Sequence, residues 1–303
     1  MQKIAIIGSG DIAQKAYLPI ISRRLVEIHL CARNTKVASE IGREYGIRNI
    51  HTTLESLINS GIKGAFVHTS TASHHEILTQ LLSRSIHVYV DKPVTYEYPS
   101  SKQLFELARM NKARLMVGFN RRYAPAYRGL KELKNVNMVV MQKNRKALPA
   151  EVRTFIFDDF IHVIDTLLYL FPQARHSLTV SGRKRNGLLY QVAVQFASPD
   201  GLIAIGIMNR DSGTVEERIE VFTPDGKWQV NNVTDTVLYR DKSEKKMGAN
   251  DWESTLYKRG FDQIVDEFLS CLKDDGLPLQ HQIPDPLITH KVCEEIVERL
   301  YKQ

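Results

Sequence analysis

The chain has 303 residues, of which 43% are hydrophobic and 25% charged, and its formal net charge is +7. This length suffices for two domains with a sizeable core each, and the composition is that of a soluble globular protein. We find no apolar run of membrane-spanning length and no basic region followed by an apolar signal core. Three cysteines without motif spacing argue against a disulfide framework or a zinc site, so we expect a cytoplasmic protein.

The N-terminal stretch carries the clearest functional pattern. An apolar run from Ile4 to Ile7 predicts a buried strand, and Gly8, Gly10 and Ala13 follow with the G-x-G-x-x-G/A spacing before a helical stretch. The first glycine permits a tight turn, the second lets the backbone approach a pyrophosphate, and the alanine keeps the helix close to the strand. The N–H groups at the start of the helix suit phosphates. We therefore predict a dinucleotide site that includes Gly8, Ser9, Gly10, Asp11, Ile12 and Ala13.

The end of the second predicted strand, Val26–Ala32, bears on the choice of cofactor. In dinucleotide-binding folds an acidic residue about 20 positions after the glycines hydrogen-bonds the ribose 2′-hydroxyl of NAD. Here Arg33 and Asn34 follow the strand, and no acid is present at this point. An arginine can hold a 2′-phosphate through two hydrogen bonds, although Arg33 could also simply begin an exposed helix. The pattern favours NADP over NAD, with Arg33 and Asn34 as contacts.

The segment up to residue 122 alternates strands and helices. Thr52-x-x-Glu55 and Ser73-x-x-Glu76 have the spacing of capping boxes and predict the starts of two helices. The alternation predicts a parallel, doubly wound sheet in a first domain over residues 1–122. The later strands are expected at 49–52, 64–69, 86–90 and 114–119, and helices at 54–59 and 100–110.

Polar residues follow several of these strands. Ligands bind beyond the carboxyl ends of the strands in such sheets, so these residues should converge on one edge. We interpret His74 and His75 as first-turn residues of a helix that Ser73 caps, rather than as catalysts. The further cofactor contacts expected at this edge are Thr69, Ser70, Ser73, His74, Asp91, Lys92, Asn120 and Arg121.

From residue 123 the pattern changes to consecutive strands. A strand at 137–142 and a helix at 158–170 come first, and turn signals such as Ser198-Pro-Asp-Gly201 separate the later strands. This pattern predicts an α+β domain over residues 123–303 with an antiparallel meander. An open sheet leaves an apolar face to cover, so we expect a homo-oligomer, a dimer through this sheet. The other expected strands are 177–182, 188–196, 202–209, 217–222 and 227–230, and the closing helices are 257–272 and 286–301.

The positive charge raises the question of nucleic-acid binding. The densest basic clusters, Arg183–Arg185 and Lys242–Lys246, are short and have no aromatic residues between their cations. No helix-turn-helix, zinc-finger or RNA-binding sheet pattern accompanies them. We interpret them as solvated turns and expect neither a nucleic acid nor a membrane as a partner.

A lysine and a histidine stretch could carry chemistry. Lys92 stands at the end of a strand, where it could polarise a carbonyl or stabilise an alkoxide, and the proline after it could follow a cis peptide. Asp158, His162 and Asp165 are spaced i, i+4 and i+7, so they share one helix face. A carboxylate one turn away can orient an imidazole as a general base, whereas Asp165 is interpreted as a structural partner. Asp-x-x-x-His also suits a metal, but no further Cys/His cluster accompanies it, so we expect no metal site.

Together these motifs resemble the glucose–fructose oxidoreductase / inositol dehydrogenase / MocA family. The resemblance is carried by Gly8-x-Gly10-x-x-Ala13, Thr69–His74, Asp91-Lys92-Pro93 and Asp158-x-x-x-His162-x-x-Asp165, in an order that fits essentially the whole chain. The segments 67–74, 117–122 and 158–166 look closer still to its MviM-type branch. The resemblance implies an α/β fold: a Rossmann domain and an α/β domain with a large, mainly antiparallel open sheet.

The resemblance also implies an NAD(P)-dependent oxidoreductase. It would transfer hydride between the cofactor and a hydroxyl or carbonyl carbon of a sugar, polyol or related small metabolite. The family's catalytic lysine maps onto Lys92, and its Asp-x-x-x-His pair maps onto Asp158 and His162, with His162 as proton acceptor or donor. The expected substrate contacts are Lys92, Tyr123, Arg145, Asp159 and His162. Two alternatives remain: a cofactor-binding sensor without turnover, and redox-assisted glycoside cleavage.

The sequence departs from the family pattern in three places. Asp91 stands where Glu is commoner, and Ser70-Thr71 replaces the usual Pro-Asn after the fourth strand. Phe160 stands where many members have Gly, two residues before His162. We expect the ring of Phe160 to narrow or redirect the substrate pocket.

Overall fold

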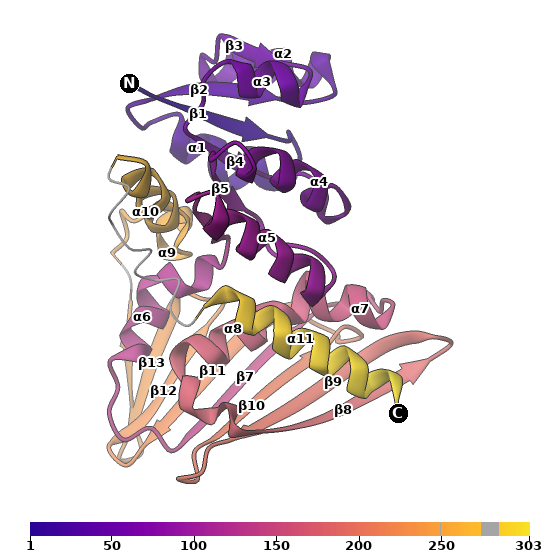
Figure 1. The fold of residues 1–303 in the computed structure, drawn as a ribbon. Helices are drawn as coiled ribbons and strands as arrows, with labels where there is room; N and C mark the ends of the chain where they lie inside the picture. The colour runs from indigo at the N-terminus through magenta and orange to yellow at the C-terminus, as the bar shows by residue number, and fades with distance from the viewer. Residues whose placement is uncertain (249, 274–284) are drawn as a thin grey trace. The chain divides into compact units, whose positions relative to one another are not determined.

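A computed structural model describes residues 1–248, 250–273 and 285–303. The chain forms two compact units (Figure 1). The first contains Met1–Gly118 and helix α10 (Phe261–Lys273), and the second contains Phe119–Gly260 and helix α11 (Pro286–Tyr301). A single boundary at residues 122/123 does not describe this division, because the chain returns to the first unit for one helix.

The first unit is built on a six-stranded parallel sheet with the order β3-β2-β1-β4-β5-β6. This confirms the doubly wound sheet predicted from the alternation of strands and helices. Ile4–Ile6 are fully buried, as are all residues of β4 from Ala65 to Val67, because helices cover both faces of such a sheet. The strands are β1 Gln2–Ile7, β2 Val26–Cys31, β3 Asn49–His51, β4 Gly64–Val67, β5 His87–Val90 and β6 Leu115–Val117.

Two of the predicted helix caps in this unit are wrong. Thr53, not Thr52, caps α3, since its side chain accepts from the Ser56 N–H at 3.2 Å. Helix α4 begins at Thr71 because β4 ends two residues earlier than predicted, so Ser73 lies inside the first turn and donates to the Ser70 carbonyl at 2.8 Å. The helical elements are a π-helical turn Ala13–Tyr17, α1 Leu18–Ile21, α2 Thr35–Tyr45, α3 Leu54–Asn59, α4 Thr71–Leu82 and α5 Tyr98–Met110.

Helix α10 packs on the strands of the first unit. The Phe268 ring meets Phe66 of β4 edge to face, with 4.8 Å between the ring centroids. A Cβ at Gly64 would lie 2.7 Å from Leu272 Cδ1, so the glycine lets the helix approach the strand closely. Arg24 adds an ion pair to Asp266 with an N–O distance of 2.7 Å. These contacts make α10 part of the core of the first unit.

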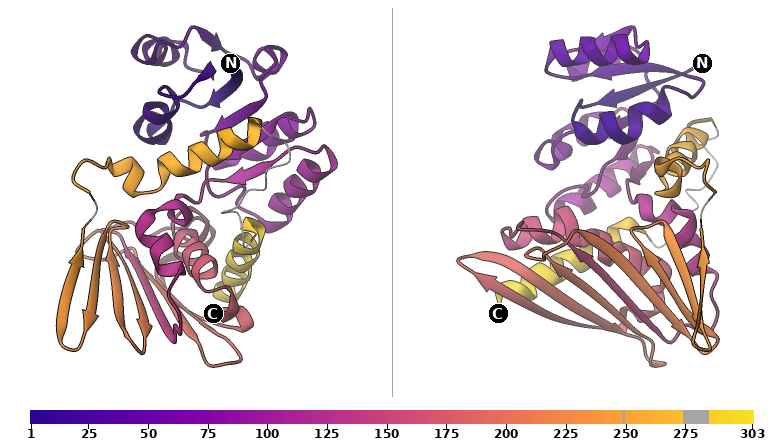
Figure 2. Two further views of the ribbon diagram at one scale, coloured as in Figure 1. Left: turned by 90° about the vertical axis from the view of Figure 1, so that its left-hand side faces the viewer. Right: turned by 180° about the vertical axis from the view of Figure 1, so that it is seen from behind.

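The second unit is built on an eight-stranded sheet with the order β14-β13-β12-β11-β7-β10-β9-β8 (Figure 2). All neighbouring strands are antiparallel except β7 and β10, which are parallel. This confirms the mainly antiparallel sheet, and it adds two strands, β13 and β14, that the sequence did not predict. The strands are β7 Met138–Asn144, β8 Ser177–Arg185, β9 Leu188–Ala197, β10 Ile203–Asn209, β11 Glu216–Thr223, β12 Gly226–Asn231, β13 Asp235–Arg240 and β14 Ser243–Met247.

Helices cover one face of this sheet, and no helix of the described residues lies on the other (Figure 2). Val163 and Leu167 of α8 pack over Gly206, where a Cβ would come within 2.9 Å of Val163 Cγ1. On the other face, alternate residues such as Val140 and Ile205 stay partly exposed. The helical elements are 3₁₀ turns Asn120–Tyr123 and Pro172–His176, a π-helical turn Ile156–Phe160, α6 Pro125–Lys131, α7 Val152–Phe155, α8 Ile161–Leu170, α9 Thr255–Lys258 and α11.

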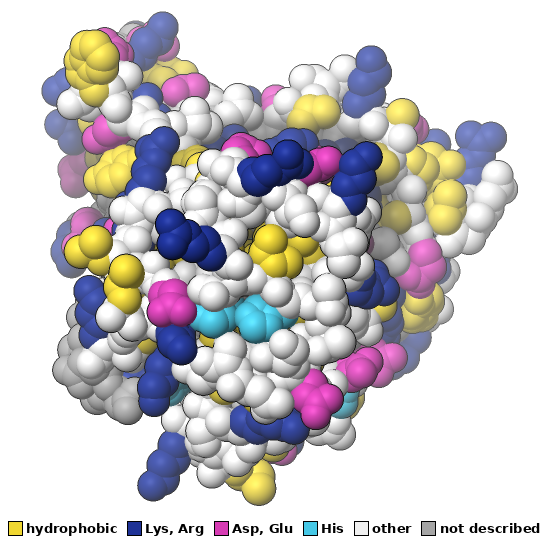
Figure 3. Space-filling view, turned by 90° about the horizontal axis from the view of Figure 1, so that it is seen from above, with side chains coloured by type: hydrophobic (Ala, Val, Ile, Leu, Met, Phe, Trp, Pro, Cys, Tyr) yellow, Lys and Arg dark blue, Asp and Glu magenta, His cyan; other side chains and the backbone are white. Residues whose placement is uncertain are grey.

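The two basic clusters are exposed but do not lie in turns alone. Arg183–Arg185 end strand β8, and Lys245 and Lys246 belong to β14, so the interpretation as turns is corrected to exposed strand ends. On the face shown in Figure 3, Lys and Arg side chains are spread among acidic and uncharged ones.

Among the described residues, no helix combines the length and the hydropathy needed to cross a membrane. The thiols of Cys31, Cys271 and Cys293 are free and buried.

Candidate functional site

A pocket of about 610 Å³ lies at the carboxyl ends of the strands in the first unit. It is formed by the turn after β1, the residues after β2 and β4, and the first turns of α4. Eight predicted cofactor contacts line it, which is the convergence that the strand-edge argument requires. The lining residues are Ile7, Gly8, Ser9, Gly10, Cys31, Ala32, Arg33, Asn34, Thr52, Leu54, His68, Thr69, Ser70, Ser73, Glu76, Ile77 and Gln80.

Gly8 and Gly10 of the opening motif each lack a side chain for a different steric reason. Gly8 has φ +100°, and a Cβ there would lie 2.8 Å from the carbonyl carbon and oxygen of His68. A Cβ at Gly10 would meet nothing within 4 Å, so the absence of a side chain leaves open space over the turn. A phosphate group can approach the backbone through such a space. The pocket therefore fits a dinucleotide cofactor.

The other residues of the motif support the turn and do not line the pocket with side chains. Ala13 is fully buried, as expected for close packing of helix and strand. Ile12 is 41% exposed, and Asp11 forms an exposed ion pair with Lys15. Neither Asp11 nor Ile12 lines the pocket, so their cofactor contacts stay predictions.

Arg33 and Asn34 follow β2 at one end of the pocket. Asn34 caps α2, since its side-chain oxygen accepts from the Val37 N–H at 3.2 Å. Arg33 is exposed and lines the pocket, so its guanidinium is accessible to a ligand. Glu76 is the carboxylate in the lining, and it comes from α4 and not from the end of β2.

His68 joins the pocket to a buried polar network that the sequence did not predict. Its Nδ1 lies 2.8 Å from the Asp91 carboxylate, and its ring stacks on Tyr17 with 4.0 Å between centroids. The hydroxyls of Tyr17 and Tyr89 are 2.5 Å apart, and burial together with the Asp91 charge raises the pKa of both phenols. His68 Nε2 is buried and has no hydrogen-bond partner among the described residues. An orphaned ring nitrogen in the pocket wall suits a ligand that can complete the bond.

His74 stands behind the pocket and holds two loops together. It is fully buried, with Nε2 3.2 Å from the Thr69 carbonyl oxygen and Nδ1 3.0 Å from that of Pro93. Burial lowers the pKa of its imidazole. Its side chain thus supports the loops after β4 and β5, and the predicted cap by Ser73 plays no part. The Lys92–Pro93 peptide is cis, and Lys92 is half-buried.

In the second unit, His162 lies at the start of α8 beside a buried ion pair. Arg121 places Nη1 2.7 Å from His162 Nδ1 and binds both oxygens of Glu217 through Nε and Nη2, each at 2.6 Å. Arginine can only donate, so Nδ1 accepts and the neutral ring carries its hydrogen on Nε2. Burial opposes the carboxylate of Glu217, but Arg121 outweighs it and lowers the Glu217 pKa to about 2.

Asp165 is a structural residue, as interpreted from the sequence. Its side chain is 1% exposed and binds Arg122, which is fully buried, with Nη2–Oδ1 at 2.6 Å and Nε–Oδ2 at 3.0 Å. Thr289 of α11 donates a further hydrogen bond to Oδ1 at 2.9 Å. The interaction ties α8 to α11 and to the 3₁₀ turn that begins at Asn120.

The predicted site residues Asn120, Arg121 and Tyr123, at the start of the second unit, are buried. Asn120 donates to the Arg259 carbonyl at 2.9 Å, and together with the ion pair of Arg121 this places both side chains in contacts inside the second unit and not in the nucleotide pocket. Tyr123 is 1% exposed. Phe160 is fully buried, and its effect on the shape of a substrate pocket stays a prediction.

The Asp159 carboxylate of the second unit is in contact with two cationic side chains. Lys143 Nζ lies 2.5 Å from Oδ1, and Arg145 binds both oxygens with distances of 2.9 and 3.1 Å. Burial of Asp159 is outweighed by these cations, which lower the pKa of its carboxyl. Arg145 and Asp159 were predicted to contact the substrate, whereas Lys143 was missed.

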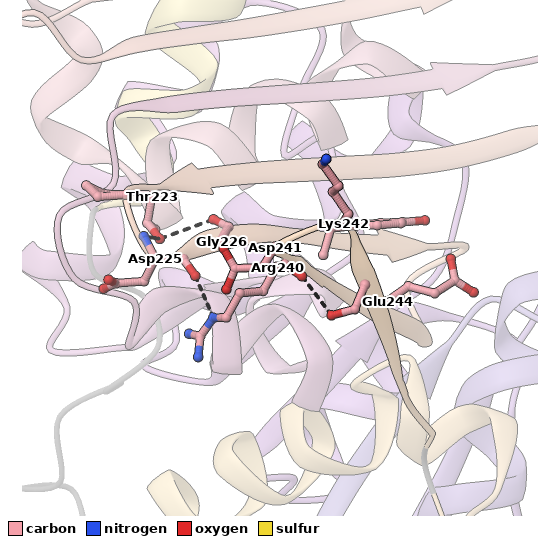
Figure 4. A pocket seen from close by; sticks show the side chains of 10 residues that line it. Thr223, Asp225, Gly226, Arg240, Asp241, Lys242 and Glu244 are labelled. Atoms are coloured by element: carbon pink, nitrogen blue, oxygen red, sulfur yellow. Dashed lines mark hydrogen bonds between the residues drawn. The ribbon is translucent and has the colours of Figure 1, made fainter.

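A second depression, of about 420 Å³, lies where the β11–β12 and β13–β14 turns meet (Figure 4). Its polar groups bond to one another: Arg240 Nε donates to the Asp225 carbonyl at 2.7 Å, and Ser243 Oγ donates to the Arg240 carbonyl at 2.7 Å. None of the predicted site residues lines it. The depression is therefore explained by the packing of two hairpin ends.

Comparison with known proteins gives matches along the whole chain. Residues 2–119 match the family model "Oxidoreductase family, NAD-binding Rossmann fold", and residues 125–241 match "YceM-like, C-terminal domain". The chain is 32% identical over 286 residues to a Salmonella typhimurium protein named "Putative oxidoreductase YceM", covering 91% of each chain.

Two solved structures are similar over nearly their full length. A Gfo/Idh/MocA family oxidoreductase from Vibrio cholerae has 31% identity and a TM-score of 0.92, with 100% of this chain and 99% of that one covered. A dehydrogenase (MviM) from Clostridium difficile has 28% identity and a TM-score of 0.89, with 98% and 99% covered.

Proposed function

Because this chain belongs to the Gfo/Idh/MocA family of oxidoreductases, with an NAD-binding Rossmann unit, we propose a specific reaction for it. It transfers hydride between NAD(P) and a hydroxyl or carbonyl carbon of a sugar, polyol or related small metabolite. The observation that carries the proposal is the pocket at the strand ends, where Gly8 allows the tight turn and Gly10 leaves open space for a pyrophosphate.

The nicotinamide supplies the hydride chemistry when it is bound, and side chains of the protein handle the proton. His162 takes the hydroxyl proton during oxidation and returns it during reduction. Proton uptake needs the lone pair of Nδ1, which accepts from Arg121 Nη1 at 2.7 Å. We infer that substrate displaces this one hydrogen bond, while Nε and Nη2 of Arg121 stay bound to Glu217.

Two further residues have proposed roles from the family pattern. Lys92 stabilises negative charge that develops on the substrate oxygen, because an ammonium group near a forming alkoxide lowers its energy. Asp158 orients the His162 ring. Lys92 belongs to the first unit, whereas Asp158 and His162 belong to the second.

The cofactor half of the proposal is tested by thermal-shift titration with NADPH, NADP, NADH and NAD. A ligand that binds the native state raises its melting temperature according to its concentration relative to Kd. We expect all four to stabilise the protein, the phosphorylated forms at lower concentration. A lack of shift with every nucleotide would overturn the proposal. Tight binding without redox turnover on a broad substrate panel would favour the sensor alternative.

NADP preference is proposed to depend on Arg33. We expect Arg33→Met to weaken NADPH binding about tenfold to hundredfold, since a hydrogen-bonded pair with a charged phosphate is lost, and to leave NADH binding within about threefold. The measurement is the Kd of both nucleotides by fluorescence titration. Arg23→Met, an exposed arginine before β2, is the matched control. Equal losses for the two nucleotides would show that Arg33 does not read the 2′-phosphate.

The uncovered face of the eight-stranded sheet is proposed to form a homodimer. Ile205 pairs with Val140 of the parallel neighbour β7, and both are only partly buried in the single chain. We expect a dimer at micromolar concentration in sedimentation analysis and a monomer for Ile205→Glu, because a charge would be buried in an apolar contact. Val215→Glu, at a 61% exposed position, is the matched control and should stay dimeric. A monomeric wild type would refute the dimer.

A further inference from the structure

Charged side chains crowd around Asp159 at one end of the eight-stranded sheet. Lys143 and Arg145 contact its carboxylate directly, and Arg210 Nε lies 4.0 Å from Oδ2. We call Lys143, Arg145 and Arg210 the basic cluster. Asp159 stands three residues before His162 in the helical segment, so the cluster lies one turn from the proposed proton acceptor.

Arg210 is the member whose bonds are incomplete. The residue is 6% exposed, and its Nε and Nη1 have no hydrogen-bond partner among the described residues. Its guanidinium lies over the Phe155 ring, 5.1 Å from the centroid, which fixes the plane without using the N–H groups. Leaving a buried charged donor unsatisfied is costly, and such a group in a native structure requires an explanation.

Lys143 is the most buried member of the basic cluster. It is 3% exposed although its ammonium contacts Asp159. Burial and the neighbouring Arg121 nevertheless lower the pKa of Lys143 to about 7. Burial is the larger of these two causes, and an added negative charge nearby would favour the charged form of Lys143.

Arg121 has its own carboxylate partner beside the basic cluster. Arg121 is matched by Glu217, with which it forms both of its carboxylate bonds. The three cations of the basic cluster face Asp159, and the charge of Asp158 also acts on Arg210. The Arg145 side chain is 36% exposed, which connects the cluster to solvent.

We propose that the basic cluster binds an anionic group of the substrate, a carboxylate or a phosphate, through Arg210 and Arg145. This rests on the proposed function and narrows its substrate class to acidic sugars or polyols and their phosphate esters. Guanidinium groups present paired N–H donors that match the oxygens of both anions, and Asp159 holds the cations in place until the anion arrives. Arg210 is a specificity residue here, and its two unpartnered N–H groups are the donors that the anion completes.

The test measures binding to the full-length protein saturated with NADPH, in a buffer free of phosphate and at constant ionic strength. Matched triplets are compared by calorimetry: a neutral hexose, its uronate and its 6-phosphate, for glucose, galactose and mannose. We expect at least one charged member to bind about tenfold or more tightly than its neutral parent. Preference for the uronate or for the phosphate identifies the anion. Equal affinities within every triplet, or no binding by any charged member, would overturn the proposal.

Variants of Arg210 separate recognition from folding. Arg210→Met should weaken the charged ligand about tenfold or more, and Arg210→Lys, which keeps the charge without the paired donors, should lie between it and wild type. Arg183→Met, an exposed arginine at the end of β8, is the matched control and should bind as wild type does. NADPH affinity and melting temperature are measured for each variant. A charged ligand that binds Arg210→Met as tightly as wild type would refute the role.

The same panel distinguishes this inference from the proposed function. Absorbance of NADPH is followed for each compound in both directions of the reaction. Turnover of neutral sugars with no effect of Arg210→Met would leave the oxidoreductase proposal standing and reject the anion site. Failure of the protein to bind any nicotinamide nucleotide would reject the proposed function itself.

Discussion

Replacing His162 with Ala is expected to lower kcat by about 10²- to 10⁴-fold, the range found for removal of a positioned general acid–base group. The Kd for NADPH should not change, because His162 belongs to the second unit and the nucleotide pocket to the first. The measurement pairs steady-state kinetics with a nucleotide titration on the same preparation. A loss in kcat with preserved cofactor binding is the signature of a group that acts on the reacting atoms.

His75→Ala is the control for this experiment. His75 is exposed on α4, so the same side chain is removed without touching the proposed machinery. It should retain wild-type kcat. If His162→Ala turned over at the wild-type rate, His162 would have no part in proton transfer, and the reaction would need another acceptor.

Asp165→Ala is expected to lower the free energy of unfolding of the second unit by about 3–5 kcal/mol, as found when one partner of a buried ion pair is removed. Arg122 would then be a fully buried cation without its carboxylate. Thr289 would also lose the acceptor of its 2.9 Å hydrogen bond. Denaturant unfolding of the full chain, followed by circular dichroism, measures the change.

The double variant Arg122→Met/Asp165→Leu separates the cost of an unpaired charge from the worth of the pair. Removing both charges should restore much of the stability lost in Asp165→Ala, because no ion stays buried alone. Glu106→Ala, which breaks the exposed pair with Lys102, should change stability little. A free energy of unfolding for Asp165→Ala within about 1 kcal/mol of the wild-type value would be a loss no larger than that of a surface ion pair. Such a result would show that Arg122 finds another partner or water.

The parallel sheet of the first unit could be predicted because its strands are short apolar runs between polar loops. Both faces of β4 are covered, and its residues Ala65, Phe66 and Val67 are all apolar. Two helix starts could not be predicted. Thr52 and Thr53 are adjacent and equally suited to cap α3, and only the backbone geometry selects Thr53.

Two strands of the second unit, β13 and β14, were not predicted because their residues are mostly exposed. All residues of β14 are exposed, and its sequence Ser-Glu-Lys-Lys-Met resembles a solvated loop. Gly260, at φ +83°, separates α9 from α10, which the sequence had merged into one helix. A glycine near the start of an apolar periodic stretch could have indicated the break.

Lys143 and Arg210 were missed, although the alternation of buried and exposed residues along their strands indicates both. Lys143 continues the buried face of Val139 and Met141 in β7, so a period of two places it under the helices. Arg210 likewise follows Ala204 and Met208. A charged residue that continues the buried phase of a strand is the pattern that could have found both. Arg121 was assigned to the cofactor because it follows a strand, but the chain has already entered the second unit at Phe119.

The return of the chain to its first unit has a consequence for synthesis on the ribosome. Phe268 and Leu272 pack against β4, yet they are made more than 200 residues after the glycine motif, and only once residue 273 has been translated is α10 complete. Domains generally fold in the order in which they are made. Here the surface of the first unit's sheet that α10 covers stays exposed while the eight-stranded sheet is being translated. Nascent chains of this protein thus carry an unfinished apolar surface through most of translation, and neither unit can be obtained by cutting the chain once.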